Sequence, residues 1–178
     1  MNLWPALLLV GLAAPGPRQP AIRDLSIALD GVQVLVSFQL EHALTTDLAE
    51  RIESGLPSGF VYEISLARDR QWWDEGIASV RLEVVAMYNA VTREFLVNFK
   101  QDGELLDSRV LTDRTELERA MTRFSALPLF TLDQASARER YLVRTRVELA
   151  PGSLLGFIPM RRTTSWVESN KVRVRAQG

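Results

Sequence analysis

The sequence predicts a mainly β protein: an antiparallel two-layer β-sandwich of immunoglobulin-like or similar Greek-key type, with two short helices. Apolar and polar residues alternate with a period of two over several runs, which is typical of half-buried strands. Asp-Gly pairs at 30–31 and 102–103 follow two of these runs and indicate tight hairpin turns. The polar outer faces favour antiparallel sheets over a parallel sheet that is buried on both sides.

The expected strands follow from the apolar parity of each run. They cover residues 25–29, 32–40, 60–66, 80–88, 95–99, 104–111, 141–149 and 172–174. Parity places Val32 among the inward residues of its run, whereas the pattern leaves the facing of 104–111 open. The sequence Asp74-Glu75-Gly76 is expected to turn the chain between two of the longer strands.

Two helices are expected between the strands. Thr45 or Thr46 can cap the first. Asp113 and Glu116 have capping-box spacing at the start of the second, which Pro128 is expected to stop. The residues expected to face inward are Leu48 and Ile52 in the first helix, and Leu117, Ala120, Met121 and Phe124 in the second.

The composition excludes several chemistries. The chain has 178 residues, a formal net charge of −1, and apolar and charged fractions of 47% and 24%, which suit one globular domain. It has no cysteine, which excludes disulfides, thiolate metal ligands and cysteine nucleophiles. Its one histidine, His42, cannot build a zinc site from several imidazoles. We therefore expect no cofactor, and the near-neutral charge predicts no nucleic-acid partner.

Residues 1–20 are expected to be a signal peptide with a flexible lead-in, and residues 21–178 a single β-sandwich domain. The stretch from Leu3 to Ala14 is apolar and uncharged, which suits a secretory signal but is too short to span a bilayer. The expectation is an exported, periplasmic protein with no transmembrane span in the mature chain. The alternative is an apolar tail that packs on the domain, or a wrongly assigned start.

No familiar catalytic motif is present in the sequence: it has no nucleophile elbow, phosphate-binding loop, dinucleotide fingerprint or zinc helix. His42 stands beside Glu41 at the end of an expected strand, a place more typical of a surface residue than of a catalytic base. Asp74 and Glu75 are neighbours rather than carboxylates opposed across a cleft. We expect no enzymatic activity, with a carboxylate-based hydrolase as the remaining alternative.

Consecutive tryptophans at 72 and 73 are the most conspicuous local feature. Parity predicts that Trp72 points inward and that Trp73 points outward. An exposed indole near Arg68, Arg70 and Asp74 is a candidate interaction site, because tryptophan and arginine are frequent in binding hot spots. The alternative is that Trp73 covers a sheet edge or packs under a loop.

A second candidate is a basic face formed by arginines with outward parity on the last two expected strands. If these strands pair, the guanidinium groups could bind lipid phosphate, a polyanion or an acidic protein surface. Arginines on the solvent side of a sheet also keep it soluble, so this face can equally be structural. The residues are Arg138, Arg140, Arg144, Arg146, Arg173 and Arg175.

Several stretches of the sequence resemble one family when they are taken together. They are Ser54-Gly55-Leu56-Pro57, Phe60-Val61-Tyr62-Glu63-Ile64, Arg68-x-Arg70-x-Trp72-Trp73-Asp74, Tyr88 to Phe95 and Ser165-Trp166. The chain resembles an uncharacterised bacterial family of small exported proteins, known only as a domain of unknown function. Asn89 and Phe95 depart from the Asp and Tyr of that pattern. The family has no assigned catalytic residues to carry over.

The resemblance also bears on function, because some relatives are encoded beside a membrane histidine kinase and its response regulator. That arrangement implies an accessory role near an envelope sensor. The expected function is therefore a non-catalytic binding or accessory module of the bacterial cell envelope with a protein partner. Binding of anionic lipid or a polyanion by the arginine face is the alternative.

Overall fold

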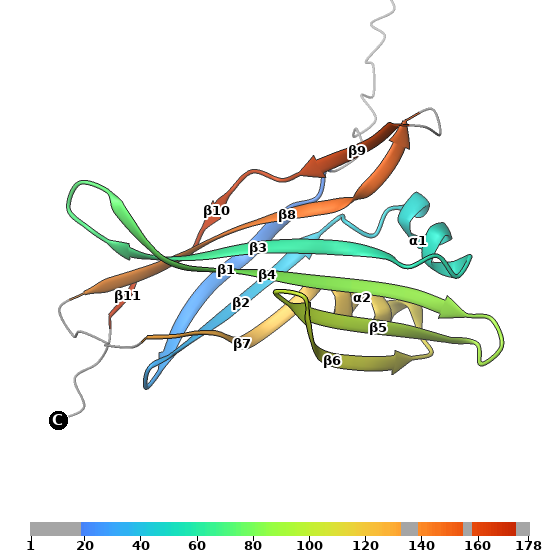
Figure 1. Ribbon diagram of the computed structural model, residues 1–178, viewed down its shortest axis with the longest axis horizontal. Helices are drawn as coiled ribbons and strands as arrows, with labels where there is room; N and C mark the ends of the chain where they lie inside the picture. The colour runs from blue at the N-terminus through green and yellow to red at the C-terminus, as the bar shows by residue number, and fades with distance from the viewer. Residues whose placement is uncertain (1–18, 133–138, 155–157, 174–178) are drawn as a thin grey trace, which may run out of the picture.

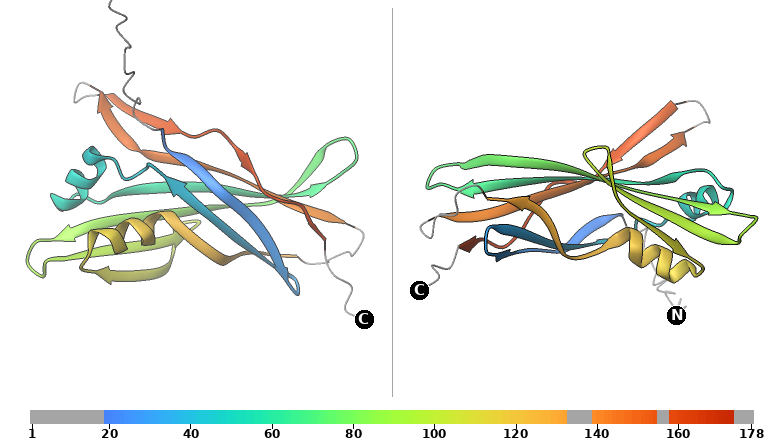
Figure 2. Two further views of the ribbon diagram at one scale, coloured as in Figure 1. Left: turned by 180° about the vertical axis from the view of Figure 1, so that it is seen from behind. Right: turned by 60° about the horizontal axis from the view of Figure 1, so that its bottom comes forward.

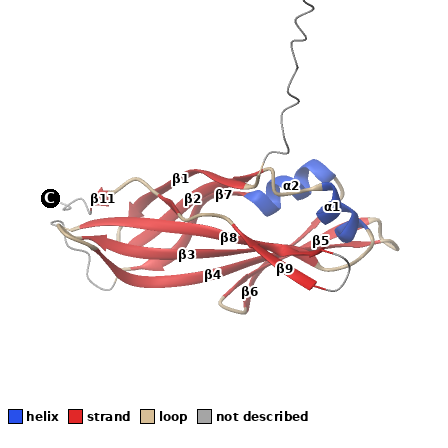
Figure 3. Cartoon of the chain, turned by 90° about the horizontal axis from the view of Figure 1, so that it is seen from above, coloured by secondary structure: helices blue, strands red, loops and turns tan. Residues whose placement is uncertain are grey.

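The alternating runs fold into two antiparallel sheets that pack face to face (Figures 1 and 3). The computed structural model describes residues 19–132, 139–154 and 158–173. The strands are β1 Ala21–Asp30, β2 Gln33–Glu41, β3 Ser58–Asp69, β4 Asp74–Asn89, β5 Glu94–Gln101, β6 Glu104–Leu111, β7 Arg123–Thr131, β8 Arg140–Leu154, β9 Ile158–Thr163, β10 Val167–Glu168 and β11 Val172–Arg173. The helices are α1 Thr46–Glu53 and α2 Arg114–Thr122.

The two sheets differ in size. The smaller has three strands in the order β1-β2-β7, and the larger has eight, with the path β10-β8-β3-β4-β5-β6. The short strands β9 and β11 also pair with β8, so three segments together cover its outer edge. The chain runs β3 to β6 as a meander, crosses to the smaller sheet as β7, and returns as β8 beside β3, a Greek-key-like connection. Figure 2 shows the sheets from two further sides. The expected mainly β, antiparallel sandwich with two short helices is confirmed.

Both predicted Asp-Gly turns connect neighbouring strands. Asp102 and Gly103 have φ values of 50° and 90°, the left-handed conformations that join β5 to β6 tightly. Gly31 has φ 59° between β1 and β2. Val32 was predicted to face inward, and this is wrong: it lies in that turn and is exposed. Parity applies only after the strand has begun.

The predicted turn at Asp74-Glu75-Gly76 is also wrong. These residues begin β4, where Asp74 pairs with Asp69 and Glu75 with Arg68. The chain turns earlier, over residues 70–73. The cross-strand charge pairs of Glu75 keep this polar segment in the sheet, although its composition is that of a loop.

A strand that the sequence did not indicate follows α2. The helix ends at Thr122, and Phe124 belongs to β7, where it lies opposite Phe38 of β2. Pro128 was predicted to end the helix, but it lies inside β7. β7 is an edge strand of the smaller sheet, where a residue without an N–H is tolerated, and Ala126 at φ 50° accompanies its irregular register.

The predicted helix starts are confirmed. The Thr45 side chain accepts from the amide of Leu48 (3.3 Å), which caps α1. The Asp113 carboxylate accepts from the amides of Thr115 (2.8 Å) and Glu116 (3.0 Å), which caps α2. The expected inward residues Leu48, Ile52, Leu117 and Met121 are buried.

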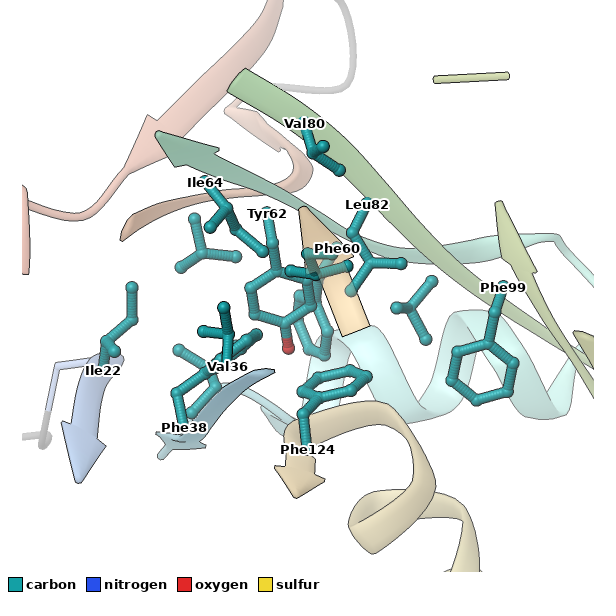
Figure 4. Close-up of a cluster of buried hydrophobic side chains, with 14 of the residues drawn as sticks. Ile22, Val36, Phe38, Phe60, Tyr62, Ile64, Val80, Leu82, Phe99 and Phe124 are labelled. Atoms are coloured by element: carbon teal, nitrogen blue, oxygen red, sulfur yellow. The ribbon is translucent and has the colours of Figure 1, made fainter. Parts of the chain in front are cut away.

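The core lies between the sheets and is centred on aromatic rings (Figure 4). Phe38 and Phe124 have ring centroids 4.8 Å apart, and Tyr62 lies 5.1 Å from Phe38. The Tyr62 hydroxyl donates to the carbonyl of Met121 (2.8 Å), which pairs a polar atom in a fully buried site. Burial raises the pKa of Tyr62 well above its ordinary value, so this hydroxyl keeps its proton.

Candidate functional site: a hairpin with two exposed tryptophans

The loop of the β3–β4 hairpin projects at one end of the larger sheet (Figure 1). It carries Trp72, which is 82% exposed, and Trp73, which is 71% exposed. The outward placement of Trp73 agrees with the prediction, whereas the inward placement of Trp72 is wrong. β3 ends at Asp69, so its alternation does not continue into the loop. The two indoles therefore lie together on a protruding turn.

Four charged side chains form a cluster at the base of this hairpin. Arg70 donates to Glu75 Oε2 from Nε (3.0 Å) and Nη2 (2.9 Å), and Arg68 Nη1 lies 3.4 Å from the same oxygen. Glu139 lies 3.0 Å from Arg68 Nε and 3.8 Å from Arg70 Nη1. Each guanidinium group thus contacts both carboxylates. The hydrogen bond from Arg70, with the charges of both arginines, lowers the pKa of Glu75.

A second set of ion pairs joins the same hairpin to the neighbouring strands. Asp69, whose side chain is 6% exposed, lies 2.7 Å from Arg140 Nε and 3.0 Å from Lys171 Nζ. The carboxylate of Asp74 pairs with Arg144. These contacts connect β3 and β4 with β8 and the segment before β11. The base of the hairpin is therefore fixed, while the Trp-Trp turn itself is exposed to solvent.

The structure changes the role of three predicted interaction residues. Arg68, Arg70 and Asp74 were predicted to surround an exposed indole, and they do lie at the hairpin. Their charged groups are, however, engaged with carboxylates or with Arg144. They are positioned to hold the turn, and the exposed surface is that of the two tryptophans.

The predicted basic face is only partly described, because Arg138 and Arg175 lie outside the described residues. The expected pairing of the last two strands is present, with Arg173 opposite Arg140. Arg144 also contacts Glu168 (3.2 Å), and Arg146 donates to Glu63 (2.6 Å). The described arginines of β8 therefore each have an acidic partner, which lowers the net positive charge of this face.

Trp166 adds an aromatic contact to the same face. Its ring lies 4.7 Å from the guanidinium carbon of Arg146, a cation–π distance. Its side chain is 45% exposed, less than either tryptophan of the hairpin. This indole covers a paired arginine, whereas neither Trp72 nor Trp73 has a cation–π contact among the described residues.

Sequence reasoning missed Glu75 and Glu139 as partners of the hairpin arginines. Glu75 was taken as a turn residue, and its pairing depends on a strand boundary that composition does not mark. Glu139 is distant in sequence and reaches Arg68 only because β8 lies beside β3. The one available signal was the alternation of Arg68 and Arg70, which places both side chains on one side of an extended strand.

Two open cavities lie away from the hairpin. One, of about 330 Å³, lies between β5–β6 and α2–β7 and is lined by Phe99, Phe124 and Arg109, among others. The other, of about 310 Å³, is lined by His42 and Glu41, among others, and the Nε2 atom of His42 lies 4.0 Å from Oε2 of Glu41. Within residues 19–132, 139–154 and 158–173, no group of three acidic or histidine side chains could hold a metal ion. No helix in these ranges is long and apolar enough to cross a membrane.

The fold and the hairpin define a class of protein: a two-sheet antiparallel β-sandwich with two short helices and a protruding aromatic turn. Within this class, residues 18–155 match the model of a family described as a domain of unknown function, DUF4390. The chain belongs to this family, as the resemblance in the sequence indicated. No curated protein and no solved structure matches the chain.

Proposed function

We propose that this protein is an exported, non-catalytic binding module of the bacterial cell envelope, and that it captures a protein partner with Trp72 and Trp73. The observation that supports this most is the exposure of two adjacent indoles, 82% and 71%, on a protruding turn. Two adjacent exposed indoles form a contiguous apolar surface, which is more typical of binding sites than single exposed apolar residues are, and tryptophan is enriched in binding hot spots.

The fixed base of the hairpin favours recognition by a preformed surface. Arg68, Arg70, Glu75 and Glu139 hold the ends of the turn by mutual ion pairs. A turn whose ends are already ordered loses less conformational entropy on binding than a free loop. Only the indole side chains must then be immobilised and desolvated by the partner.

A protein partner suits the charges better than anionic lipid does. The arginines of β8 that the structure describes pair with Asp69, Asp74 and Glu63, so little of their charge is available to phosphate groups. Our specific proposal for the partner is the extracytoplasmic part of a membrane sensor kinase, which follows from the accessory role that the family resemblance implies.

Capture from envelope extracts tests the proposal. The wild-type protein should recover one membrane sensor protein, and Trp72→Ala with Trp73→Ala should reduce recovery at least about tenfold, since a hot spot typically contributes 2 kcal/mol or more. Trp166→Ala is the matched control: it also removes a partly exposed indole, but on the sheet face, and should leave recovery unchanged.

Two outcomes would contradict this function. Equal recovery by the double variant and the wild type would remove the hairpin from the interaction. Salt-sensitive binding to anionic vesicles that is lost in Arg144→Glu, with no protein captured, would instead support the lipid alternative. Export is checked separately by detecting the chain in the periplasmic fraction of its own cells.

A further inference from the structure

The last strand of the larger sheet, β6, has an open edge. β6 pairs with β5 on one side, and no other described strand pairs with its outer side. Leu105, Leu106 and Val110 are 60%, 53% and 60% exposed on this strand. An edge strand with exposed apolar side chains is a template for another strand, and natural proteins normally protect such an edge.

The backbone of β6 offers a donor at this edge. The amide of Ser108 donates to Oδ1 of Asp107 (2.8 Å), a side chain of its own strand. This bond indicates that the Ser108 amide faces the open edge rather than β5. In a regular antiparallel ladder, backbone groups that face the same side recur at every second residue, so the groups of Val110 share this direction, whereas Leu106 lies at a bulge and does not follow the alternation.

The residues of β6 are self-complementary about Ser108. The sequence Leu106-Asp107-Ser108-Arg109-Val110 reads as apolar, acidic, polar, basic and apolar. Within one strand the Asp107 carboxylate lies 2.8 Å from Arg109 Nε. If a second β6 is placed antiparallel with Ser108 opposite Ser108, each of these two groups also faces the opposite charge of the other copy. Two charge pairs result from one two-fold arrangement.

We propose that β6 binds β6 of a second copy of this chain in this register, which joins the two larger sheets into one continuous sheet. Registers shifted by two residues in either direction are disfavoured, because they place Asp107 opposite Asp107 or Arg109 opposite Arg109. Shifts by one residue place Leu106 opposite Arg109, or Asp107 opposite Val110. Among these registers, the centred one alone places opposite charges across from each other.

The proposed contact is small, and the dimer is therefore weak. The register of β6 against β5 shifts between Phe99 and Lys100, which leaves Leu106 as the extra residue of a bulge. The regular part of the strand is short. A contact of this kind buries less than the roughly 1,200 Å² of most stable interfaces, so dimers should form at about 0.1–1 mM protein.

Charge exchange tests both the interface and its register. Sedimentation equilibrium of the purified full chain should show an apparent mass that rises with concentration from 20.1 kDa towards twice that value. Asp107→Arg and Arg109→Asp should each remain monomeric, because like charges then face each other. A mixture of these two variants should dimerise again, because the two arginines of one copy face the two aspartates of the other.

The control and the contradicting outcomes are distinct from those of the hairpin. Asp107→Arg combined with Arg109→Asp in one chain should restore the wild-type dimer, which excludes misfolding as the cause of the loss. The proposal is overturned by a wild type that stays monomeric up to about 1 mM. It is equally overturned by dimers that survive both single variants, or by a mixture of the single variants that stays monomeric.

Discussion

The side-chain hydroxyl of Thr145 in β8 is expected to destabilise the folded state. Its side chain is fully buried, and its Oγ1 has no hydrogen-bond partner among the described residues. A buried hydroxyl without a partner has lost its hydrogen bonds to water and gained none in return. The neighbours across the sheet are Ile64 and Val167, so the site is apolar.

Replacement of this hydroxyl by a methyl group should stabilise the protein. Thr145→Val keeps the shape of the side chain and should raise the free energy of unfolding by about 1 kcal/mol, as measured by urea denaturation. Thr122→Val is the control and should lower the free energy of unfolding, because the buried Thr122 hydroxyl donates to the Glu118 carbonyl (2.6 Å). A destabilised Thr145→Val would show that the hydroxyl has a bound water or another partner.

Sequence parity predicted single residues well inside strands and poorly at their ends. The inward placement of Tyr62 and the outward placement of Trp73 could both be read from alternation. Trp72 could not, because its orientation depends on where β3 ends. That boundary is set by the charge pairs of Glu75 and Glu139, which a one-dimensional pattern does not contain.

At the scale of elements, the start of α2 shows how a short motif determines a local structure. Asp113 accepts from two of the amides that have no partner within the helix, those of Thr115 and Glu116. Both hydrogen bonds form within four residues of the chain, so this helix cap could be predicted from the sequence. The cap fixes where α2 begins and so where Leu117 and Met121 enter the core.

Loss of this cap should fray α2. Asp113→Ala should lower the thermal midpoint and speed amide exchange in the first turn of α2, because two donors lose their acceptor. Asp113→Asn retains a side-chain oxygen and should have a smaller effect. The same exchange rates in the alanine variant and the wild type would mean that packing alone holds this helix end.

The end of the same helix was not predictable from local sequence. The stripe from Leu117 to Phe124 fits helical spacing, yet Phe124 lies in β7. Pairing of β7 with β2 and packing of Phe124 against Phe38 decide this change of structure. Both partners are distant in the chain, so tertiary contacts override the local preference.

At the scale of the whole molecule, the sequence predicted the class of fold but not the order of the strands. Alternation predicts which face of each strand is buried, and the two Asp-Gly turns predict two pairs of neighbouring strands. Neither signal shows that β8 returns beside β3, and the ion-pair cluster at the hairpin depends on that pairing. The division into three and eight strands likewise comes from packing across the chain.

The acidic groups that stabilise separate parts of the molecule predict its response to pH. The pKa of Glu75 is lowered by its hydrogen bond and charge contacts with Arg70 and Arg68, and the pKa of Asp113 by the amides that it caps. Their carboxylates are ionised in the folded state at a pH where the unfolded chain already binds protons. Stability is therefore present above the unfolded pKa values and is lost as the pH falls below about 4.

Urea denaturation between about pH 3 and pH 7 measures this loss. The variant with Glu75→Gln and Asp113→Asn should show a flatter dependence at the acidic end, because neither amide side chain titrates. An unchanged slope would assign the acid sensitivity to other carboxylates. The Asp69 ion pairs with Arg140 and Lys171 would then be the next groups to replace.

The placement of the tryptophans also determines what their fluorescence can report about this molecule. Three of its four indoles, those of Trp72, Trp73 and Trp166, are described, and each is substantially exposed to water in the folded state. A solvated indole emits at long wavelength, so we expect unfolding of the sheets to change the emission of these three side chains little. An occupant that covers the hairpin would shift the emission to shorter wavelengths. The fluorescence of the three described indoles should therefore respond weakly to unfolding and strongly to whatever covers that turn.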